Sequence, residues 1–292
     1  MKHYVLLILF LFVSLNVFSQ NFYFLSASAN LEKFTIIDSA YIKCSYKLTY
    51  IKDTLKSDEQ SSDLQILLIG KDVSKYYSQY ALNYNIFIEE FRKKKPENNI
   101  PNINEQGAWT YEVFKNYPQG KETVTDIASM LGGFKGQNFE YQESLPDLPW
   151  KLSNDYQKVL SYNCQKATVR FRGRDFIAWF SSEIPISNGP WKFGGLPGLI
   201  LKISDTKNNF TYECVGLEQL KTKQPIKYYN LEYTKISRQK LYDLYKRFHD
   251  DMAYYVKMAL GTNTRELDSK TNQSKSVEHS SFKIPYNPIE LE

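Results

Sequence analysis

Histidine and cysteine are scarce in this chain, and their scarcity argues against several kinds of enzyme. The 292 residues include three histidines and three cysteines. Beyond the first 20 residues only His249 and His279 remain, and neither lies in the strand-rich part of the sequence. A Ser-His or Cys-His catalytic pair is therefore poorly supported. His-Glu-x-x-His pairs, Cys-x-x-Cys pairs and Gly-x-Ser-x-Gly elbows are absent from the sequence, so no metal site and no cofactor are predicted.

Long apolar runs are also lacking, apart from one near the N-terminus. A short basic start precedes an apolar run from Tyr4 to Val13, and small or polar residues follow. This order is typical of a secretory signal peptide, with cleavage expected near Ser19 or Gln20. A membrane-spanning helix needs about 20 apolar residues, and no run reaches that length. We expect residues 1–20 to be a signal peptide, with export to the periplasm or cell surface and no transmembrane span.

No charge of one sign dominates. Lys and Arg exceed Asp and Glu by 37 to 32, and the basic clusters at 91–95 and 170–174 are local. So small and scattered an excess does not favour nucleic-acid binding. Aromatic residues, by contrast, are plentiful, with 23 tyrosines and 18 phenylalanines. Tyrosine suits half-buried strand faces, because its ring packs while its hydroxyl finds a partner or water.

The three cysteines allow at most one disulfide and leave one thiol over. Strand parity places Cys44 and Cys214 on apolar faces, whereas Cys164 falls on the face opposite Ala167. A Cys44–Cys214 bridge is one pairing compatible with this pattern, and the sequence leaves the other pairings open.

Alternation with a period of two residues dominates the chain and predicts strands. They are expected at residues 35–51, 63–70, 109–117, 121–127, 134–142, 149–152, 199–204 and 210–217, with a hairpin over 160–181. A period of three to four residues predicts two helices, one between Asp72 and Phe91 and one from Ser237 to Leu260. The predicted fold class is mainly β: a curved antiparallel sheet or open half-barrel with a packed C-terminal helix and one additional helix.

The same patterns divide the chain into segments. Residues 21–261 are expected to form a single β-rich domain, because no linker or repeat splits them. Residues 262–282 are polar and poor in apolar side chains, which predicts disorder. Residues 283–292 regain apolar and proline residues, and we expect them to dock as an extended segment.

The most specific motif is the stretch from Gly189 to Ile200, Gly-Pro-Trp-Lys-Phe-Gly-Gly-Leu-Pro-Gly-Leu-Ile. Pro197 and Gly198 predict a type II turn, with positive φ at the glycine. One interpretation is a tight corner that leads into a core strand. The other is the mouth or lid of a binding cavity. On that second interpretation the candidate ligand-binding residues are Trp191, Phe193, Gly194, Gly195, Leu196, Pro197 and Gly198.

The stretch Gly195-Leu196-Pro197-Gly198-Leu199-Ile200 matches, letter for letter, the motif after which the GLPGLI family is named. Residues 162–167, the strand around Trp179, Gly189-Pro190 and the terminal Tyr286–Leu291 also resemble that family. The resemblance spans nearly the whole chain after the predicted signal peptide. It implies an exported protein of the Bacteroidota type, without an established biochemical function and without catalytic residues to transfer.

Three functions are compatible with these patterns. The first is a non-catalytic binding role in the envelope, in which the sheet carries an apolar, lipid-like small molecule in a cavity. The second is an accessory protein that docks on an outer-membrane or secretion component through an exposed strand edge. The third is a carboxylate-dependent hydrolase, whose signature would be a coupled set such as Asp175, Glu183 and Cys164 in one cleft. A carrier requires a deep apolar cavity, whereas an accessory protein requires a filled core and an exposed apolar patch.

Overall fold

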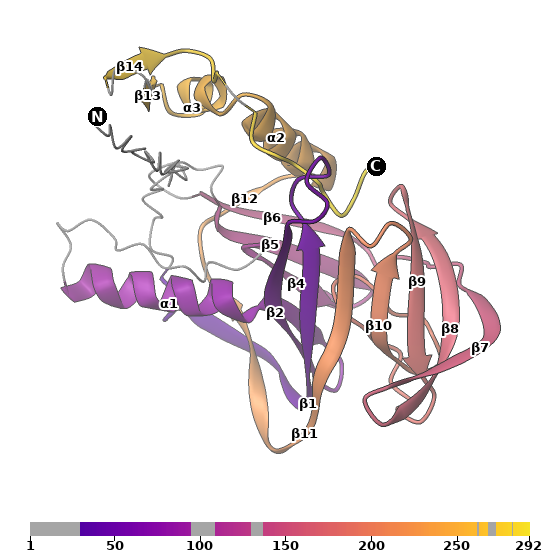
Figure 1. Cartoon of the computed structure of the whole chain (residues 1–292). Helices are drawn as coiled ribbons and strands as arrows, with labels where there is room; N and C mark the ends of the chain where they lie inside the picture. The colour runs from indigo at the N-terminus through magenta and orange to yellow at the C-terminus, as the bar shows by residue number, and fades with distance from the viewer. Residues whose placement is uncertain (1–29, 95–108, 130–136, 262, 268–272, 282) are drawn as a thin grey trace, which may run out of the picture.

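The computed structural model describes residues 30–94, 109–129 and 137–292, except 262, 268–272 and 282. The predicted signal peptide lies outside these residues. Among the described residues, strands far outweigh helices, and one large open sheet forms the body of the protein (Figure 1). The predicted fold class, a mainly-β curved sheet with helices packed on it, is confirmed. No helix in the described part of the chain is both long and apolar enough to cross a membrane.

Twelve strands build the main sheet in the order β12-β6-β5-β4-β3-β2-β1-β11-β10-β9-β8-β7. Neighbouring strands are antiparallel, except that β12 runs parallel to β6. The strands are β1 (Phe34–Ile51), β2 (Gln60–Ile69), β3 (Ser74–Ser78), β4 (Tyr111–Lys115), β5 (Lys121–Ser129), β6 (Gln137–Ser144), β7 (Lys151–Val159), β8 (Tyr162–Phe171), β9 (Arg174–Ser181), β10 (Leu199–Asp205), β11 (Phe210–Tyr229) and β12 (Tyr233–Lys235).

The region after β2 departs from the predicted helix. Residues 74–78 form β3, and α1 spans Gln79–Lys94. All five residues of β3 are buried, because the strand pairs with β2 on one side and β4 on the other. Tyr76 and Tyr77 fit either period, so only the pairing with neighbouring strands decides between helix and strand.

The C-terminal helical region is divided in two. Helix α2 spans Arg238–Asp250 and α3 spans Met252–Leu260. Ser237 caps α2 by accepting from the Lys240 N–H, as expected from the sequence. Asp251 has a non-helical backbone, with φ −154° and ψ 86°, and caps α3 by accepting from the Tyr254 N–H, so the helix is interrupted there. Within the stretch predicted to be disordered, β13 (Thr264–Leu267) and β14 (Ser274–Val277) form a small hairpin.

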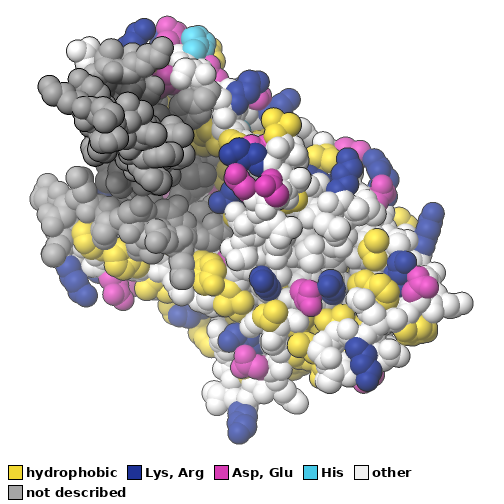
Figure 2. Space-filling model, viewed as in Figure 1, with side chains coloured by type: hydrophobic (Ala, Val, Ile, Leu, Met, Phe, Trp, Pro, Cys, Tyr) yellow, Lys and Arg dark blue, Asp and Glu magenta, His cyan; other side chains and the backbone are white. Residues whose placement is uncertain are grey.

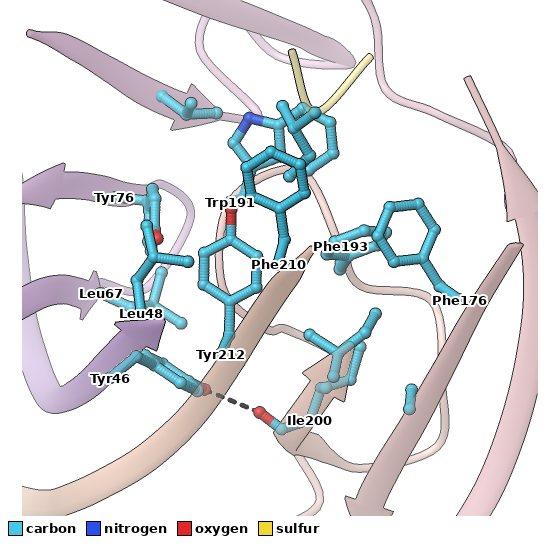
Figure 3. Packing of buried hydrophobic residues seen from close by; sticks show 14 of the residues in the cluster. Tyr46, Leu48, Leu67, Tyr76, Phe176, Trp191, Phe193, Ile200, Phe210 and Tyr212 are labelled. Atoms are coloured by element: carbon cyan, nitrogen blue, oxygen red, sulfur yellow. Dashed lines mark hydrogen bonds between the residues drawn. The ribbon is translucent and has the colours of Figure 1, made fainter. Parts of the chain in front are cut away.

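The main core cluster lies against one face of the sheet and is rich in aromatic rings (Figure 3). A smaller cluster on the opposite face contains Ile66, Leu68 and Tyr77. Phe193 and Phe176 meet at a centroid distance of 4.8 Å with their planes tilted by 64°, a favourable edge-to-face arrangement. The Tyr46 hydroxyl donates a 2.7 Å hydrogen bond to the Ile200 carbonyl, which ties β1 to the start of β10. On the face shown in Figure 2, acidic and basic side chains are interspersed.

Candidate functional site

The motif of residues 189–200 lies in the connection from β9 to β10 and enters β10 at Leu199. Its large side chains point into the core: Trp191 is 1% exposed, Phe193 0% and Leu196 2%. Gly198 is also buried, Gly194 is half-buried, and Gly195 and Pro197 are exposed. The ligand-binding role suggested for these seven residues stays a prediction. Their large apolar side chains are already in contact with other core residues.

The turn inside this motif differs from the predicted type II turn. The φ of Gly198 is not positive; positive φ occurs at Gly195, at 84°, and at Trp191, at 48°. The Gly198 N–H donates to the Leu196 carbonyl at 2.8 Å, which closes a three-residue turn around Pro197. Glycine is needed at 198 for space instead, because a Cβ there would lie 2.2 Å from the Ser181 carbonyl oxygen.

Lys115, at the end of β4, holds the first half of the motif loop. Its Nζ donates three hydrogen bonds, to Asn188 Oδ1 at 2.9 Å, to the Gly189 carbonyl at 2.7 Å and to the Phe193 carbonyl at 2.6 Å. Burial lowers the pKa of Lys115 to about 7, against the opposing effect of the Glu122 carboxylate. The amino group thus binds the loop at three points within residues 188–193.

Lys192, between Trp191 and Phe193, is buried and meets several carboxylates. Its Nζ lies 2.6 Å from Glu143 Oε1, 3.0 Å from Glu290 Oε1 and 3.3 Å from Glu122 Oε1. It also donates to the Tyr141 hydroxyl at 3.0 Å. The Lys192 side chain is 1% exposed, and those of Glu122 and Glu290 are 0% exposed, so water is excluded from these two contacts, whereas Glu143 is 20% exposed.

Two arginines complete this group. Arg172 Nη2 lies 2.9 Å from Glu143 Oε2, and Arg238 Nη1 lies 2.8 Å from Glu290 Oε2. We call the six residues the ionic cluster: Lys192, Arg172, Arg238, Glu122, Glu143 and Glu290. Its three cations balance its three carboxylates formally, which offsets part of the cost of burying charge.

Glu122 is the least satisfied carboxylate of the ionic cluster. Neither of its oxygens has a hydrogen-bond partner among the described residues, although Lys192 lies 3.3 Å from one of them. Burial raises the pKa of Glu122 to about 7, and this effect outweighs the opposing attraction of Lys192 and Lys115. The proton on Glu122 therefore stabilises the folded state at mildly acidic pH.

We expect the substitution Glu122→Gln to flatten the pH dependence of stability. The pKa of Glu122 is about 7 in the folded state, against 4.5 for an ordinary glutamate, so its contribution is complete below about pH 4.5. It is then lost as pH rises through 7, by roughly 1 kcal/mol per pH unit. Urea unfolding of both proteins at several pH values across this window measures the effect. Parallel pH profiles for the two proteins would contradict it.

The ionic cluster was not predicted from the sequence. Lys192 is the only charged residue between Gly189 and Ile200, and a lysine between Trp191 and Phe193 is the one available signal of a buried amino group. Its carboxylate partners come from β5, β6 and the C-terminus, and no local spacing relates them.

The three residues considered for a hydrolase do not form one coupled set: Glu183 lies near Cys164, whereas Asp175 lies at the other end of β9. Asp175 pairs with Arg170 on the surface at 3.3 Å, at the start of β9. Glu183 follows the other end of β9 and accepts from the Asn163 N–H at 2.9 Å. Cys164 is buried, and burial raises the pKa of its thiol to about 11, which disfavours the nucleophilic thiolate. Among the described residues, no group of three or more His, Cys, Asp or Glu residues is arranged to hold a metal ion.

The three cysteines are all buried and free. Cys44 lies on β1 and Cys214 on the neighbouring β11, and burial raises the pKa of both thiols. The Cys44–Cys214 disulfide, which strand parity allows, is therefore not formed in this structure.

Comparison with known proteins gives one family match and a weak structural likeness. A family model described as "Protein of unknown function (Porph_ging)" matches residues 172–202, a stretch that contains Arg172, Arg174 and Lys192. Two solved structures of PNGF-II, in the C2 and P21 space groups, are similar at 12% identity, with TM-scores of 0.48 and 0.47. They cover 71% and 73% of this chain, which spans about a third of their length, 33% and 34%. Comparison with curated proteins gives no match.

Proposed function

We propose that this chain is an exported accessory protein of the cell envelope, belonging to the GLPGLI family, that binds an extended segment of a partner protein. The binding surface is the free edge of β7. The observation that carries this proposal is a row of exposed apolar side chains on that edge strand: Leu152 is 55% exposed, Tyr156 57% and, in the turn that follows, Leu160 50%.

In the part of the chain that the structure describes, strand β7 is the last strand of the sheet and pairs only with β8 (Figure 1). An unpaired edge presents a row of backbone N–H and C=O groups that an extended peptide can extend as a further strand. The opposite edge of the sheet, β12, has only three residues. The longer edge, β7, is therefore the better candidate for adding a strand.

The regular half of β7 is the part suited to pairing. A bulge lies between Leu152 and Tyr156, whereas Tyr156 to Val159 pair in register with β8. A two-residue turn joins Val159 to Tyr162, so these two form the closing hydrogen-bonded pair. Alternation along an antiparallel pair then directs the N–H groups of Tyr156 and Lys158 away from β8, towards a partner.

The turn after β7 shows a second unusual feature. Leu160 has a φ of 54°, a left-handed conformation that costs a non-glycine residue about 1–2 kcal/mol. Half of this branched apolar side chain is exposed, so core packing does not explain why leucine is present here. Strained residues of this kind cluster at binding surfaces, which supports a contact role for the end of β7.

A carrier role is less well supported by the geometry. On the second interpretation of the motif, residues 189–200 would border a cavity. In the structure, Trp191, Phe193 and Leu196 are buried there and fill the space. A cavity between α1 and the sheet, lined by Tyr77, Asn85 and Glu112 among others, measures about 10 Å³. That volume suffices for one water molecule and not for an acyl chain.

The charge on the edge strand indicates which partner segment it fits. Lys151 and Lys158 are both exposed, at opposite ends of β7. A partner strand with alternating apolar residues would cover Tyr156, and carboxylates near its ends would face these lysines. The proposed partner is therefore an acidic, extended segment of another envelope protein.

Photo-crosslinking in the native envelope tests this proposal. Benzoylphenylalanine at position 156 should yield a discrete crosslinked partner, whereas the same group at Leu55, which is 93% exposed, should not. Lys158→Pro should abolish the crosslink at 156 and leave the melting temperature unchanged, because proline removes only an outward N–H and is tolerated on an edge strand. Equal crosslinking at positions 55 and 156, or crosslinking that survives Lys158→Pro, would overturn the proposal.

A further inference from the structure

The C-terminal segment Lys283–Glu292 runs along α2 to the end of the sheet (Figure 1). We call the surface that it covers the groove, which is lined by Ile51, Arg172, Arg174, Lys192, Arg238 and His249. The Ile284 N–H donates to the His249 carbonyl at 2.9 Å. The Tyr286 ring stacks on the His249 ring at 4.5 Å, with 19° between their planes. Asn287 Nδ2 donates to the Ile51 carbonyl at 2.7 Å. These contacts orient the segment before it reaches the charged part of the groove.

Arg174 binds the backbone of this segment. Its Nη2 donates to Asn287 Oδ1 and to the Pro288 carbonyl, both at 2.6 Å, and its Nε donates to the Ile289 carbonyl at 3.1 Å. Asp205 Oδ2 lies 3.2 Å from Arg174 Nη1 and holds the guanidinium in place. Both charged side chains are nearly fully buried. The guanidinium is held in place and donates hydrogen bonds to three successive residues. This geometry is well suited to binding an extended peptide.

Glu290 occupies the most selective position of the groove. Its carboxylate lies 2.8 Å from Arg238, 3.0 Å from Lys192 and 3.6 Å from Arg172, and its side chain is fully buried. The preceding Ile289 is 3% exposed and belongs to the main core. An apolar residue followed by a glutamate is therefore what this part of the groove accepts.

The charges of the groove call for an acidic ligand. Without the C-terminal segment, its four cations are Arg172, Arg174, Lys192 and Arg238. They face three carboxylates, Glu122, Glu143 and Asp205. The glutamate at position 290 supplies the missing negative charge. Any other occupant must bring a carboxylate to the same place, since an unpaired buried cation is costly.

We propose that this groove is a peptide-recognition site for segments of the type Asn-Pro-Ile-Glu, which the chain's own C-terminus occupies here and which the same segment of a second copy of this chain can occupy. The local segment competes at the high effective concentration of an intramolecular ligand. Binding between copies therefore requires that the local contacts of Asn287 and Glu290 be lost.

The test uses full-length protein and a fluorescent peptide with the sequence of residues 283–292. The double variant Asn287→Ala/Glu290→Ala releases the local segment and should bind the peptide saturably, at least tenfold more tightly than wild type does. The exposed-residue variant Lys283→Ala is the matched control and should behave like wild type. A peptide with lysine in place of Glu290 should not bind any of the proteins.

Two results would overturn the inference. One is a folded double variant, as judged by circular dichroism, that fails to bind the peptide. The other is equal binding of the peptide with the reversed charge. If the double variant loses its cooperative melting transition, adding the wild-type peptide should restore it, and failure to restore it would also reject the inference.

Discussion

Replacing Lys192 with methionine should lower the free energy of unfolding by about 3–5 kcal/mol. The substitution keeps an unbranched side chain of similar length but removes the cation that faces Glu122, Glu143 and Glu290. Two of these carboxylates are fully buried, so water cannot replace the lost ammonium group. Urea unfolding at neutral pH, compared with wild type, measures the loss.

A surface lysine is the matched control for this substitution. Lys202 Nζ lies 2.9 Å from Glu213 Oε2, with the two side chains 33% and 49% exposed, and exposed pairs of this kind contribute at most about 1 kcal/mol. Lys202→Met should therefore change stability little. Adding Glu122→Gln to Lys192→Met should recover part of the loss, because one buried carboxylate without a counter-charge disappears. Equal losses for Lys192→Met and Lys202→Met would refute the importance of the ionic cluster.

Gly198→Ala should also be strongly destabilising, by about 3 kcal/mol, the upper end for overpacking. The added methyl carbon would lie 2.2 Å from the Ser181 carbonyl oxygen and 2.9 Å from the Ser182 nitrogen. Both neighbours are backbone atoms, so relief requires β9 to move away from β10. Thermal and urea unfolding of the variant measure the cost.

Gly216→Ala is the control for the glycine substitution. A Cβ at 216 would meet only Ser45, at 3.5 Å and beyond, an ordinary contact distance. That substitution should change stability by less than about 0.5 kcal/mol. If Gly198→Ala changed stability as little as Gly216→Ala, close packing of β9 and β10 would not explain the glycine at position 198.

These two predictions assign the Gly-Pro-Trp to Leu-Ile motif a definite physical role. Lys115 holds its first half by three hydrogen bonds, Lys192 links it to three carboxylates, and Gly198 allows β9 and β10 to approach closely. Through Glu290, the same motif also contacts the C-terminal segment. Residues 189–200 therefore join the sheet, α2 and the chain end, and a substitution among them should affect all three.

Most strands could be predicted, because the alternation of apolar and polar residues depends only on residues close together in the sequence. Long strands such as β1 and the β8–β9 hairpin carry several apolar positions on one face, and the structure places them within a few residues of the predicted bounds. β3 was missed, since five residues with two tyrosines fit a helix equally well. The break at Asp251 was missed too, because the apolar stripe continues across it and only the cap reveals the interruption.

The candidate site was less predictable than the fold. The seven candidate residues were selected because they are glycine, proline or apolar, and Lys192, the charged residue between Trp191 and Phe193, was left out. A lysine is usually solvated, so its burial is visible only once three glutamates from distant segments surround it. The prediction of a type II turn at Pro197 and Gly198 was wrong for a related reason. The role of Gly198 depends on its close approach to Ser181, a residue that lies outside the turn.

The sequence by itself determined the strand-rich fold class, the cap at Ser237 and the existence of a special loop at 189–200, because periodicity, capping and turn composition act over a few residues. Only the tertiary structure decided that Lys192 faces Glu122, Glu143 and Glu290, that Arg174 holds Asn287 and Pro288, and that β7 is the edge strand among the described strands. Those outcomes depend on which strands become neighbours, and the energy of burying a charge depends on what the fold places beside it.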